Sequence, residues 1–421
     1  MKITLINTAD AGGGAPAACM RLLKALVSQK ADAQLLVQHK KTGDSKVKGL
    51  VNNFITNLKA QANFLLERIP FIAFQERDKS VRFAFSPANA GSSIVNEPWV
   101  KDADILHLHW TNSGFLSIND LTELVKTGKP IVWTLHDMWT FTGGCHYSGT
   151  CDHFMRECGN CPFLRNPDEN DISHTGWLHK AAMYANVPNI TFVTCSQWLG
   201  SVAKKSSLIK NFRIESIPNP IDIDVFSPKD ISAARKKRSI DPAAKIILFG
   251  AANINDRRKG INYLVDALNI LKADHPPTNA IEVVVFGKNK HFDVHSLPFK
   301  VHELSIITSA DELAEIYSMA DLFVTPSLED NLPNTIMESL ACGTPVVAFN
   351  TGGIPEMVDH LQNGYLAEFK SAADMAKGLH EVLNTLDAKA LANSARQKVL
   401  NNYTNEKVAQ QYMDLYQSII Q

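Results

Sequence analysis

Residues 327–347 read SLEDNLPNTIMESLACGTPVV, and this stretch decides the fold. It runs from the apolar strand Leu322–Pro326, through a polar loop and a short helix, into a second strand at Val346–Phe349. A strand, a helix and a strand in that order are the unit from which parallel sheets are built. Asp330 and Glu338 flank the start of the helix, where the helix dipole favours phosphate groups. Two carboxylates at such a helix end suit a polyhydroxy ligand that carries phosphates.

The same alternation of strands and helices extends outward over the whole chain. A loop from Pro218 to Pro228 separates two series of apolar runs that predict buried strands: Ile3–Asn7, Gln34–Gln38, Asp104–Leu108, Ile131–Leu135, Ile190–Cys195 and Ile214–Ile217, then Ile246–Gly250, Ile281–Gly287, Leu322–Pro326 and Val346–Phe349. A chain of 421 residues is too long for one hydrophobic core. We therefore expect an α/β protein with two Rossmann-like domains, over 1–221 and 222–402, and a final helix over 403–421.

The composition is that of an ordinary globular protein, with 45% hydrophobic and 20% charged residues. It excludes a disordered, collagen-like or coiled-coil chain. No run approaches the roughly 18 apolar residues that a membrane span needs. The apolar start Ile3–Asn7 is too short for a signal peptide and predicts a first strand. We expect a cytoplasmic protein with no nucleic-acid partner.

Basic residues are concentrated between His39 and Arg82, where nine Lys and Arg face four Asp and Glu. Within this segment, apolar residues recur at helical spacing over Val47–Ile69. A basic amphipathic helix can lie on an anionic membrane surface, which predicts peripheral contact with the inner membrane. A helix whose apolar stripe packs on its own domain is an equally good interpretation of the pattern.

Three glycines, Gly12, Gly13 and Gly14, follow the first predicted strand and precede Pro16. Glycines let the backbone approach a phosphate closely, and proline suits the first turn of a helix. The turn therefore predicts an anion site at a helix N-terminus. A dinucleotide site would need an acid at the end of the second strand, where Gln38 stands instead. A plain tight turn remains the alternative.

Four of the seven cysteines lie close together, within the loop expected over 139–165: Cys145, Cys151, Cys158 and Cys161. This C-x5-C-x6-C-x2-C spacing can close a tetrahedral thiolate site, which predicts a structural zinc ion with His146 and His153 as spare ligands. Reduced, packed cysteines and an iron–sulfur cluster are the alternatives.

The opening stretch, with Thr351–Glu356 and Asn363-Gly364 after it, closely resembles the retaining glycosyltransferases of family 4. The resemblance covers nearly the whole chain and includes the glycine loop, Thr134–Asp137, Arg258–Gly260 and the C-terminal helix. It implies the GT-B architecture, in which two Rossmann-like domains face each other across a cleft. The C-terminal helix of that architecture crosses back to the first domain.

The resemblance also implies roles for particular residues. Glu338 would hold the ribose of the nucleotide, and Asp330, which stands where the family has glutamate, would contact the donor sugar. Lys259 would contact the diphosphate, together with the glycine loop, and Arg257 or Arg258 would supply the charge of the family's arginine, while Asn331 and Leu332 complete the donor loop. His136 would lie near the reacting centre. The family's usual arginine is missing, since Ala252 and Asn253 stand at its place.

The function implied is transfer of a sugar from a nucleotide-diphosphate sugar to a glycan or lipid-linked acceptor, in lipopolysaccharide, capsule or exopolysaccharide biosynthesis. Cationic side chains and helix dipoles would stabilise the leaving diphosphate, so catalysis needs no metal or other cofactor. Two alternatives stay open: a sugar-nucleotide epimerase of the same fold, and a non-catalytic protein that binds nucleotide sugars.

Overall fold

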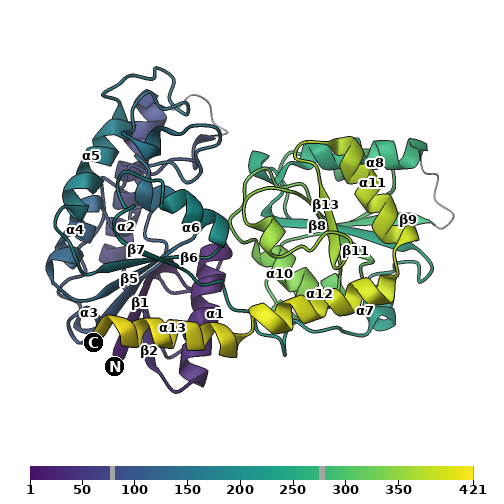
Figure 1. The fold of residues 1–421 in the computed structure, drawn as a ribbon, viewed down its shortest axis with the longest axis horizontal. Coiled ribbons are helices and arrows are strands. Elements are labelled where there is room, and N and C mark those ends of the chain that lie inside the picture. The colour runs from purple at the N-terminus through teal and green to yellow at the C-terminus, as the bar shows by residue number, and fades with distance from the viewer. Residues whose placement is uncertain (76–80, 275–279, 421) are drawn as a thin grey trace. The chain divides into compact units, whose positions relative to one another are not determined.

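The chain forms two compact units in the computed structural model, which describes residues 1–75, 81–274 and 280–420. Unit 1 consists of Met1–Asn219 together with Val408–Gln421 (Figure 1). Unit 2 consists of Pro220–Lys407. Each unit contains one parallel sheet with helices packed on it, so the prediction of two Rossmann-like domains is confirmed.

Unit 1 has a seven-stranded sheet in the order β3-β2-β1-β4-β5-β6-β7. All of its pairs are parallel, as in the register of Leu5 beside Leu35 on one side and His107 on the other. The strands are β1 (Lys2–Ala9), β2 (Asp32–His39), β3 (Val47–Gly49), β4 (Ile105–Leu108), β5 (Ile131–Leu135), β6 (Ile190–Thr194) and β7 (Arg213–Ser216). The central strands β4, β5 and β6 are buried along their whole length, as expected for a sheet covered on both faces.

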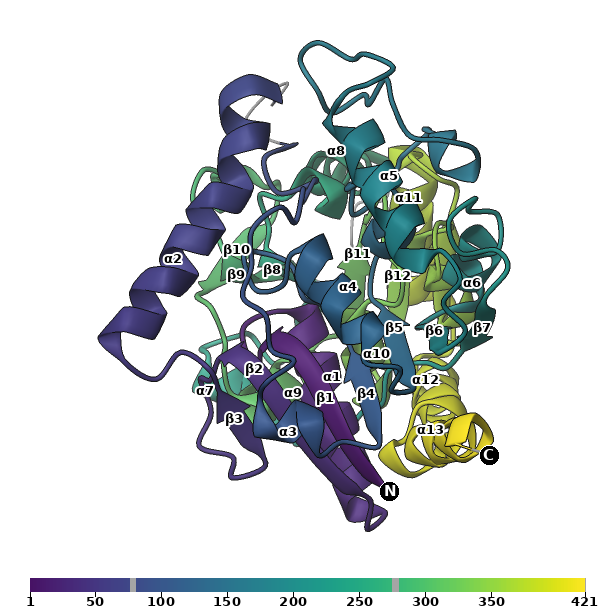
Figure 2. The same cartoon turned by 90° about the vertical axis from the view of Figure 1, so that its left-hand side faces the viewer.

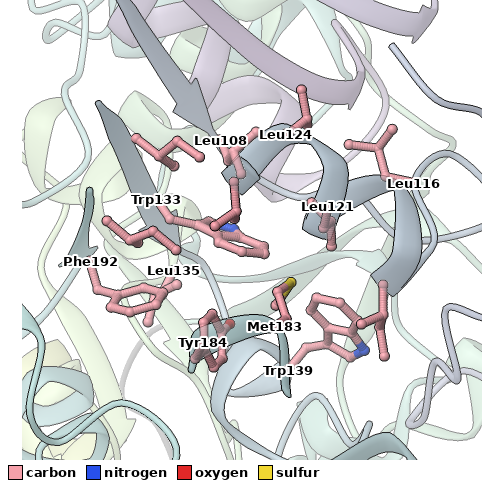
Figure 3. Close-up of a cluster of buried hydrophobic side chains, with 14 of the residues drawn as sticks. Leu108, Leu116, Leu121, Leu124, Trp133, Leu135, Trp139, Met183, Tyr184 and Phe192 are labelled. Atoms are coloured by element: carbon pink, nitrogen blue, oxygen red, sulfur yellow. The ribbon is translucent and has the colours of Figure 1, made fainter. Parts of the chain in front are cut away.

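Two hydrophobic clusters cover the two faces of this sheet, because alternate side chains of a strand point to opposite sides. On one face Trp133 and Leu135 of β5 pack against Trp139, Met183 and neighbouring side chains (Figure 3). On the other face Val132 packs with α1 and α13. The helices of unit 1 are α1 (Gly14–Ser28), α2 (Phe54–Ile69), α3 (Pro98–Lys101), α4 (Ile118–Lys126), α5 (Ile172–Tyr184), α6 (Gln197–Ala203) and the greater part of α13 (Asn405–Ile420).

The C-terminal helix α13 packs on the sheet of unit 1, as predicted. Val408, Tyr412, Leu415 and Tyr416 follow each other at helical spacing and are buried in the same cluster as α1. The last helix of the chain thereby completes the first unit.

Unit 2 has a six-stranded parallel sheet in the order β10-β9-β8-β11-β12-β13. Its strands are β8 (Lys245–Asn253), β9 (Ile281–Lys288), β10 (Lys300–Leu304), β11 (Leu322–Thr325), β12 (Val346–Phe349) and β13 (Gly364–Ala367). Its helices are α7 (Ile231–Lys237), α8 (Ile261–Asp274), α9 (Ala310–Ser318), α10 (Asn334–Ala341), α11 (Ala372–His380) and α12 (Ala388–Asn402). The opening stretch of the sequence is β11, α10 and β12, as predicted. The sequence did not predict β10 and β13 because they are short strands at the two edges.

The helix predicted over Val47–Ile69 begins too early. Val47–Gly49 is the edge strand β3, and α2 starts after Asn53, whose side chain accepts a hydrogen bond from the Thr56 amide. Most of the large apolar side chains of α2 are exposed, led by Phe54 at 79% and Ile55 at 76%. Figure 2 shows α2 as a long helix on the flank of unit 1.

Residues 76–80 of the basic segment His39–Arg82 lie outside the described part of the chain. Among the described residues, none of the helices has the length and apolar character needed to span a bilayer.

Candidate functional site

The glycine turn of unit 1 connects β1 to the N-terminus of α1. Gly12 has φ +92°, a conformation that favours glycine, and Gly13 caps a helix of 15 residues with no acidic side chain in its first turn. Asp10 fixes the turn, since its carboxylate accepts hydrogen bonds from the amides of Lys41 and Thr42 and from the Thr42 hydroxyl. The helix N-terminus therefore has the features of an anion site.

Lys41 is a further cation at this turn that the sequence reasoning missed. Its ammonium group donates to the Ala11 carbonyl at 3.1 Å, and a side chain at Gly12 would come within 3.0 Å of its Nζ atom. The signal was available in the pattern, because Lys41 follows β2, the strand beside β1. The carboxyl ends of neighbouring parallel strands meet at one edge of a sheet.

His136 follows β5 at that same edge. Its Nε2 atom lies 3.0 Å from Nδ1 of His109, which follows β4, and the two rings stack with centroids 5.3 Å apart. Burial lowers the pKa of His136 to about 4 and also lowers the pKa of His109. Both rings are therefore neutral at neutral pH, and His136 can orient polar groups but carries no charge.

A third histidine connects this pair to the C-terminal helix. His107 on β4 lies 2.6 Å from the Tyr416 hydroxyl and 2.7 Å from the Thr134 hydroxyl, which in turn bonds Tyr412 at 2.9 Å. Burial lowers the pKa of His107 to about 3. The ring centroids of His107 and His109 lie 4.4 Å apart. Through the contact of His107 with Tyr416, the helix α13 therefore supports the histidine pair.

Asp137 holds the segment after His136 in place. Its carboxylate accepts hydrogen bonds from Trp110 Nε1 at 3.1 Å and the Trp139 amide at 2.9 Å, and it contacts His146 Nδ1 at 2.7 Å. Burial acts to raise the pKa of Asp137, but the charge and hydrogen bond of His146 outweigh it, and the pKa is lowered. The sequence analysis assigned His146 only as a spare metal ligand. In the structure both of its ring nitrogens have other partners, since Nε2 lies 3.0 Å from the Ser86 hydroxyl.

Buried polar atoms gather in the segment that follows β4. Across the described residues, His109 Nε2, Thr111 Oγ1 and Asn112 Nδ2 have no hydrogen-bond partner within the protein. All three residues are at most 3% exposed. Since an unsatisfied buried donor or acceptor costs about 1–3 kcal/mol, this segment is suited to hold the polar groups of a ligand.

A cavity of about 430 Å³ opens beside the same edge of the sheet. The ends of β1 and β2 contribute Thr8, Gln38 and His39, and α2 contributes Ala60, Gln61, Phe64 and Leu65. Its wall on the side of α2 is largely apolar, and it continues into the exposed apolar side chains of that helix.

In unit 2 the structure brings Lys259 and Asp330 into direct contact. Their Nζ and Oδ2 atoms lie 2.6 Å apart, and both side chains remain partly accessible to solvent. Lys259 ends a short helical turn after β8, and Asp330 lies in the loop after β11, the neighbouring strand. Leu328 donates its amide to the carbonyl of Arg258 at 2.7 Å, which joins the two loops.

Two glycines allow these loops to approach each other. Gly260 has φ +67°, and a side chain there would meet the Pro326 carbonyl at 2.0 Å. Gly352 has φ +59°, and a side chain there would meet the carbonyl of Asp330 at 2.0 Å. The predicted motif residues Gly260 and Gly352 therefore shape the loop that carries Asp330.

Glu338 lies on α10, is 6% exposed and accepts a hydrogen bond from the Tyr317 hydroxyl at 3.0 Å. Asn331 and Leu332 lie in the loop before this helix and are almost fully buried. Arg258 points to Asp256, with 2.7 Å between Nη2 and Oδ2. The structure thus brings Lys259 and Asp330 together in the loops before α10, whereas Glu338 lies within α10 and contacts Tyr317, which the sequence did not indicate.

The four clustered cysteines line one cavity of about 20 Å³, together with His153. All seven cysteines are free thiols. Burial raises the pKa of Cys158 to about 11 and that of Cys161 to about 12. No set of three or more His, Cys, Asp or Glu side chains among the described residues stands in an arrangement that could hold a metal ion. The zinc interpretation therefore stays a prediction.

Comparison with known proteins gives these sites a context. Residues 244–385 match the family model of glycosyl transferases group 1. A D-inositol 3-phosphate glycosyltransferase of Pseudarthrobacter chlorophenolicus is 27% identical over 65% of this chain and 60% of its own length. WcaC of Escherichia coli, a glycosyl transferase named for colanic acid biosynthesis, is 24% identical over 76% of this chain and 77% of its own.

Solved structures match over the full chain. Sucrose-phosphate synthase from Thermosynechococcus elongatus has a TM-score of 0.68 at 18% identity and covers 100% of this chain and 99% of its own. HepE of Anabaena, solved with UDP-glucose, has a TM-score of 0.63 at 15% identity, and the match covers 99% of this chain and 100% of HepE. At such identities the likeness establishes the fold.

The fold and the matches define a protein of the GT-B class, and the resemblance to family 4 glycosyltransferases is confirmed. More particularly, the match to the glycosyl transferases group 1 lies within unit 2, over residues 244–385. The chain spans 60% to 65% of the length of the D-inositol 3-phosphate glycosyltransferases of Pseudarthrobacter chlorophenolicus, Paenarthrobacter aurescens and an Arthrobacter species.

Proposed function

We propose that the protein is a retaining glycosyltransferase that moves a sugar from a nucleotide-diphosphate sugar to a glycan or lipid-linked acceptor. The observation that carries the proposal is the contact of Lys259 with Asp330, 2.6 Å apart, in the segment that matches the group 1 family. Neighbours of the same fold were solved with UDP-glucose, or with UDP and GlcNAc, which supports a nucleotide-sugar donor.

Lys259 can bind the diphosphate while it keeps its hydrogen bond to Asp330. An ammonium group has three N–H donors, and the bond to Asp330 uses one of them. The other two are available for phosphate oxygens, where negative charge builds as the glycosidic bond breaks. Preorganised charge of this kind is usually the largest single contribution to such a reaction. In this proposal Glu338 binds the ribose and Asp330 the donor sugar.

In a retaining reaction the acceptor attacks from the side of the leaving group, and a phosphate oxygen takes the acceptor's proton. Such a mechanism needs no protein base. The low pKa of His136, about 4 because of burial, agrees with that role, since a neutral imidazole orients hydroxyl groups through hydrogen bonds. The buried polar atoms at 109–112 give unit 1 further groups for the acceptor or the donor sugar.

We further propose that α2 lies on an anionic membrane at the cytoplasmic face and delivers a lipid-linked acceptor to the cavity beside it. The exposed apolar residues of α2 support this: Phe54, Ile55, Leu58, Leu65, Leu66 and Ile69 are each 49% to 79% exposed. Lysines 40, 41, 46, 48 and 59 lie on α2 or before it and attract anionic headgroups. Relatives named for colanic acid and lipopolysaccharide biosynthesis suit this setting.

The donor is tested with a panel of UDP-, GDP- and ADP-sugars. We expect one of them to raise the melting temperature and to be consumed only when an acceptor is present, with retained anomeric configuration in the product. Interconversion of the sugar without acceptor would instead identify an epimerase. Binding without any turnover, over a broad set of acceptors, would identify a binding protein.

The membrane contact is tested by flotation with vesicles that contain anionic lipid, at low and high salt. We expect binding that salt weakens and that Leu58→Ser reduces several-fold. Ile306→Ser is the matched control, because Ile306 in unit 2 is 61% exposed and Leu58 is 56% exposed. Absence of binding at low salt would exclude the membrane role and leave the donor assignment intact.

A further inference from the structure

The four cysteines of the loop 139–165 converge although their order in the chain does not require it. Cys145, Cys151, Cys158 and Cys161 face one cavity of about 20 Å³. A body the size of one water molecule needs roughly 10–15 Å³ by this measure, so the cavity accommodates one small ion and is too small for a cluster of several atoms. All four cysteines are among the residues that line this cavity.

The backbone around the cavity provides a hydrogen bond to one sulfur atom and a sharp turn between two of the cysteines. Gly143 donates its amide to Cys158 Sγ at 3.2 Å. Between Cys158 and Cys161, Gly159 has φ +153° and Asn160 has φ +48°, so the chain reverses sharply and brings both sulfurs to one side. Amide hydrogen bonds to ligating sulfur are the outer contacts that orient metal ligands.

A buried cation lies close to the cavity. Lys180 on α5 is 0% exposed, and its ammonium group donates to the carbonyls of Trp139 and Thr142. Thr142 precedes Gly143 and also bonds the carbonyl of Cys145. A buried ammonium is costly unless a negative charge lies near it, and the groups whose charges act on Lys180 are Cys145, Cys158 and Asp137. Zinc bound by four thiolates carries two negative charges, which would add to the charge of Asp137 near Lys180.

We propose that Cys145, Cys151, Cys158 and Cys161 bind one zinc ion, and that this ion positions His146 and, through it, Asp137 beside His136. Binding replaces four S–H bonds with four Zn–S bonds and releases four protons to the solvent. In the structure the four thiols are not arranged as metal ligands. Zinc binding therefore requires rotation about the side-chain bonds of the cysteines. Four sulfur ligands in tetrahedral geometry select zinc and leave no open position, so the ion is structural.

The positioning role follows from the peptide bond between Cys145 and His146. Cys145 precedes His146, whose Nδ1 lies 2.7 Å from Asp137, and the His146 carbonyl accepts the amide of Met138 at 2.9 Å. Fixing Cys145 therefore fixes both contacts of the segment that follows His136. The first part of the loop 139–165 is anchored in the large core of unit 1 through Trp139 and Phe141, whereas Cys161 and Leu164 pack in a small cluster with Phe71 and Phe85. The ion would therefore add most to the part of the loop that the large core does not hold.

Metal analysis of the full chain, purified without added zinc, is the direct test. We expect about one zinc per chain, and less than about 0.2 in Cys158→Ser. Cys19→Ala is the matched control, because Cys19 is equally buried in unit 1 but lies on α1, and it should keep the metal. If Cys158→Ser does not fold, the wild type decides: chelation should release the zinc, and cobalt added afterwards should give the charge-transfer absorption of cobalt bound to thiolates.

Other outcomes would overturn the proposal. Less than about 0.2 equivalents of any metal in the wild type, with the four loop thiols titratable, would mean packed cysteines. Iron with inorganic sulfide would mean a cluster. Fewer than seven thiols in the unfolded, unreduced chain would mean disulfides.

The positioning role has its own readout, which rests on the proposed function. Chelation should lower turnover with acceptor about tenfold, leave donor binding unchanged in a thermal-shift assay, and be reversed by zinc but not by magnesium. Equal turnover with and without zinc would refute the positioning role alone, since the metal content is measured independently of activity.

Discussion

The two units place their candidate groups in opposite environments. In unit 1 His107 and His109 are buried, with His107 bonded to Tyr416, and the half-buried His136 lies against His109; loss of solvation keeps all three neutral. In unit 2 Lys259 and Asp330 are charged and remain partly exposed at the ends of two loops. Neutral, rigid groups suit orientation, whereas accessible charges suit the binding of phosphate. The comparison assigns positioning to unit 1 and charge stabilisation to unit 2.

The largest effect should come from removing charge in unit 2. Lys259→Ala removes the ammonium group that we propose binds the leaving diphosphate, and we expect transfer to fall by about 100-fold or more, as for the loss of one oxyanion donor. Glu338→Ala should be similarly inactive in an assay of product formation. Lys237→Ala is the matched control, because it also breaks a lysine–carboxylate contact of unit 2, to Glu315 at 2.9 Å, away from α10. Near-normal turnover by Lys259→Ala would remove the donor-site assignment.

The buried histidines predict that unit 1 loses stability in acid. Burial lowers the pKa of His136 from 6.5 to about 4, so the native unit binds fewer protons than the unfolded chain between these values. Stability is complete above pH 6.5 and is lost as the pH falls towards 4. For His136 alone the loss between pH 7 and pH 5 is about 2 kcal/mol, and His107 adds to it.

All six tryptophans lie in unit 1, so their fluorescence follows the unfolding of this unit in denaturant. We expect its midpoint to fall from pH 7 to pH 5, and to fall less in His136→Asn. A midpoint independent of pH would show that the histidines are not held neutral.

The contrast between the units also explains what the sequence could predict. The groups of unit 2 lie in short loops that follow strands, so Asp330 was found from the local pattern and Lys259 from the motif that resembles family 4, although 71 positions separate them. The site of unit 1 depends on contacts between neighbouring strands. His109 meets His136 only because β4 pairs with β5, and a reading of single segments gave His109 no role.

The orientation of α2 could not be predicted for a similar reason. Apolar spacing predicts a helix but does not say which face is turned inward, and here the buried positions include Asn63, Glu67 and Arg68. Arg68 donates to the carbonyls of Arg82 and Phe85, and Glu67 accepts the amide of Gly114. Polar contacts with distant segments thus bury the face that a hydrophobic pattern assigns to solvent.

If unit 1 only orients the reactants, His136→Asn should have a moderate effect. Asparagine keeps hydrogen-bonding groups but not the position of the ring, so we expect kcat to fall about tenfold, in line with about 1.4 kcal/mol of lost hydrogen bonding. Donor binding should stay within twofold, because the charges of unit 2 are untouched. His179→Asn, an exposed histidine of α5, is the control. A parallel loss of donor affinity would contradict the division of roles.

The smallest effect should be that of Asp330→Glu, which restores the family's acid. The longer side chain adds one methylene to a carboxylate that already lies 2.6 Å from Lys259. The loop itself is held by backbone contacts, since the amide of Gly353 donates to the carbonyl of Asp330 at 3.2 Å and Gly352 packs against the same group. The backbone should therefore stay in place while the carboxylate shifts by a change of rotamer. We expect kcat/KM within about threefold of the wild type, equivalent to about 0.6 kcal/mol.

Asp330→Asn is the informative partner, because it keeps the size of the side chain and removes the charge that faces Lys259. If the carboxylate matters through its charge, Asp330→Asn should lose far more activity than Asp330→Glu. The reverse order, with Asp330→Glu the more damaging, would mean that the site is built around the shorter side chain and that the family's contact to the donor sugar is not made here.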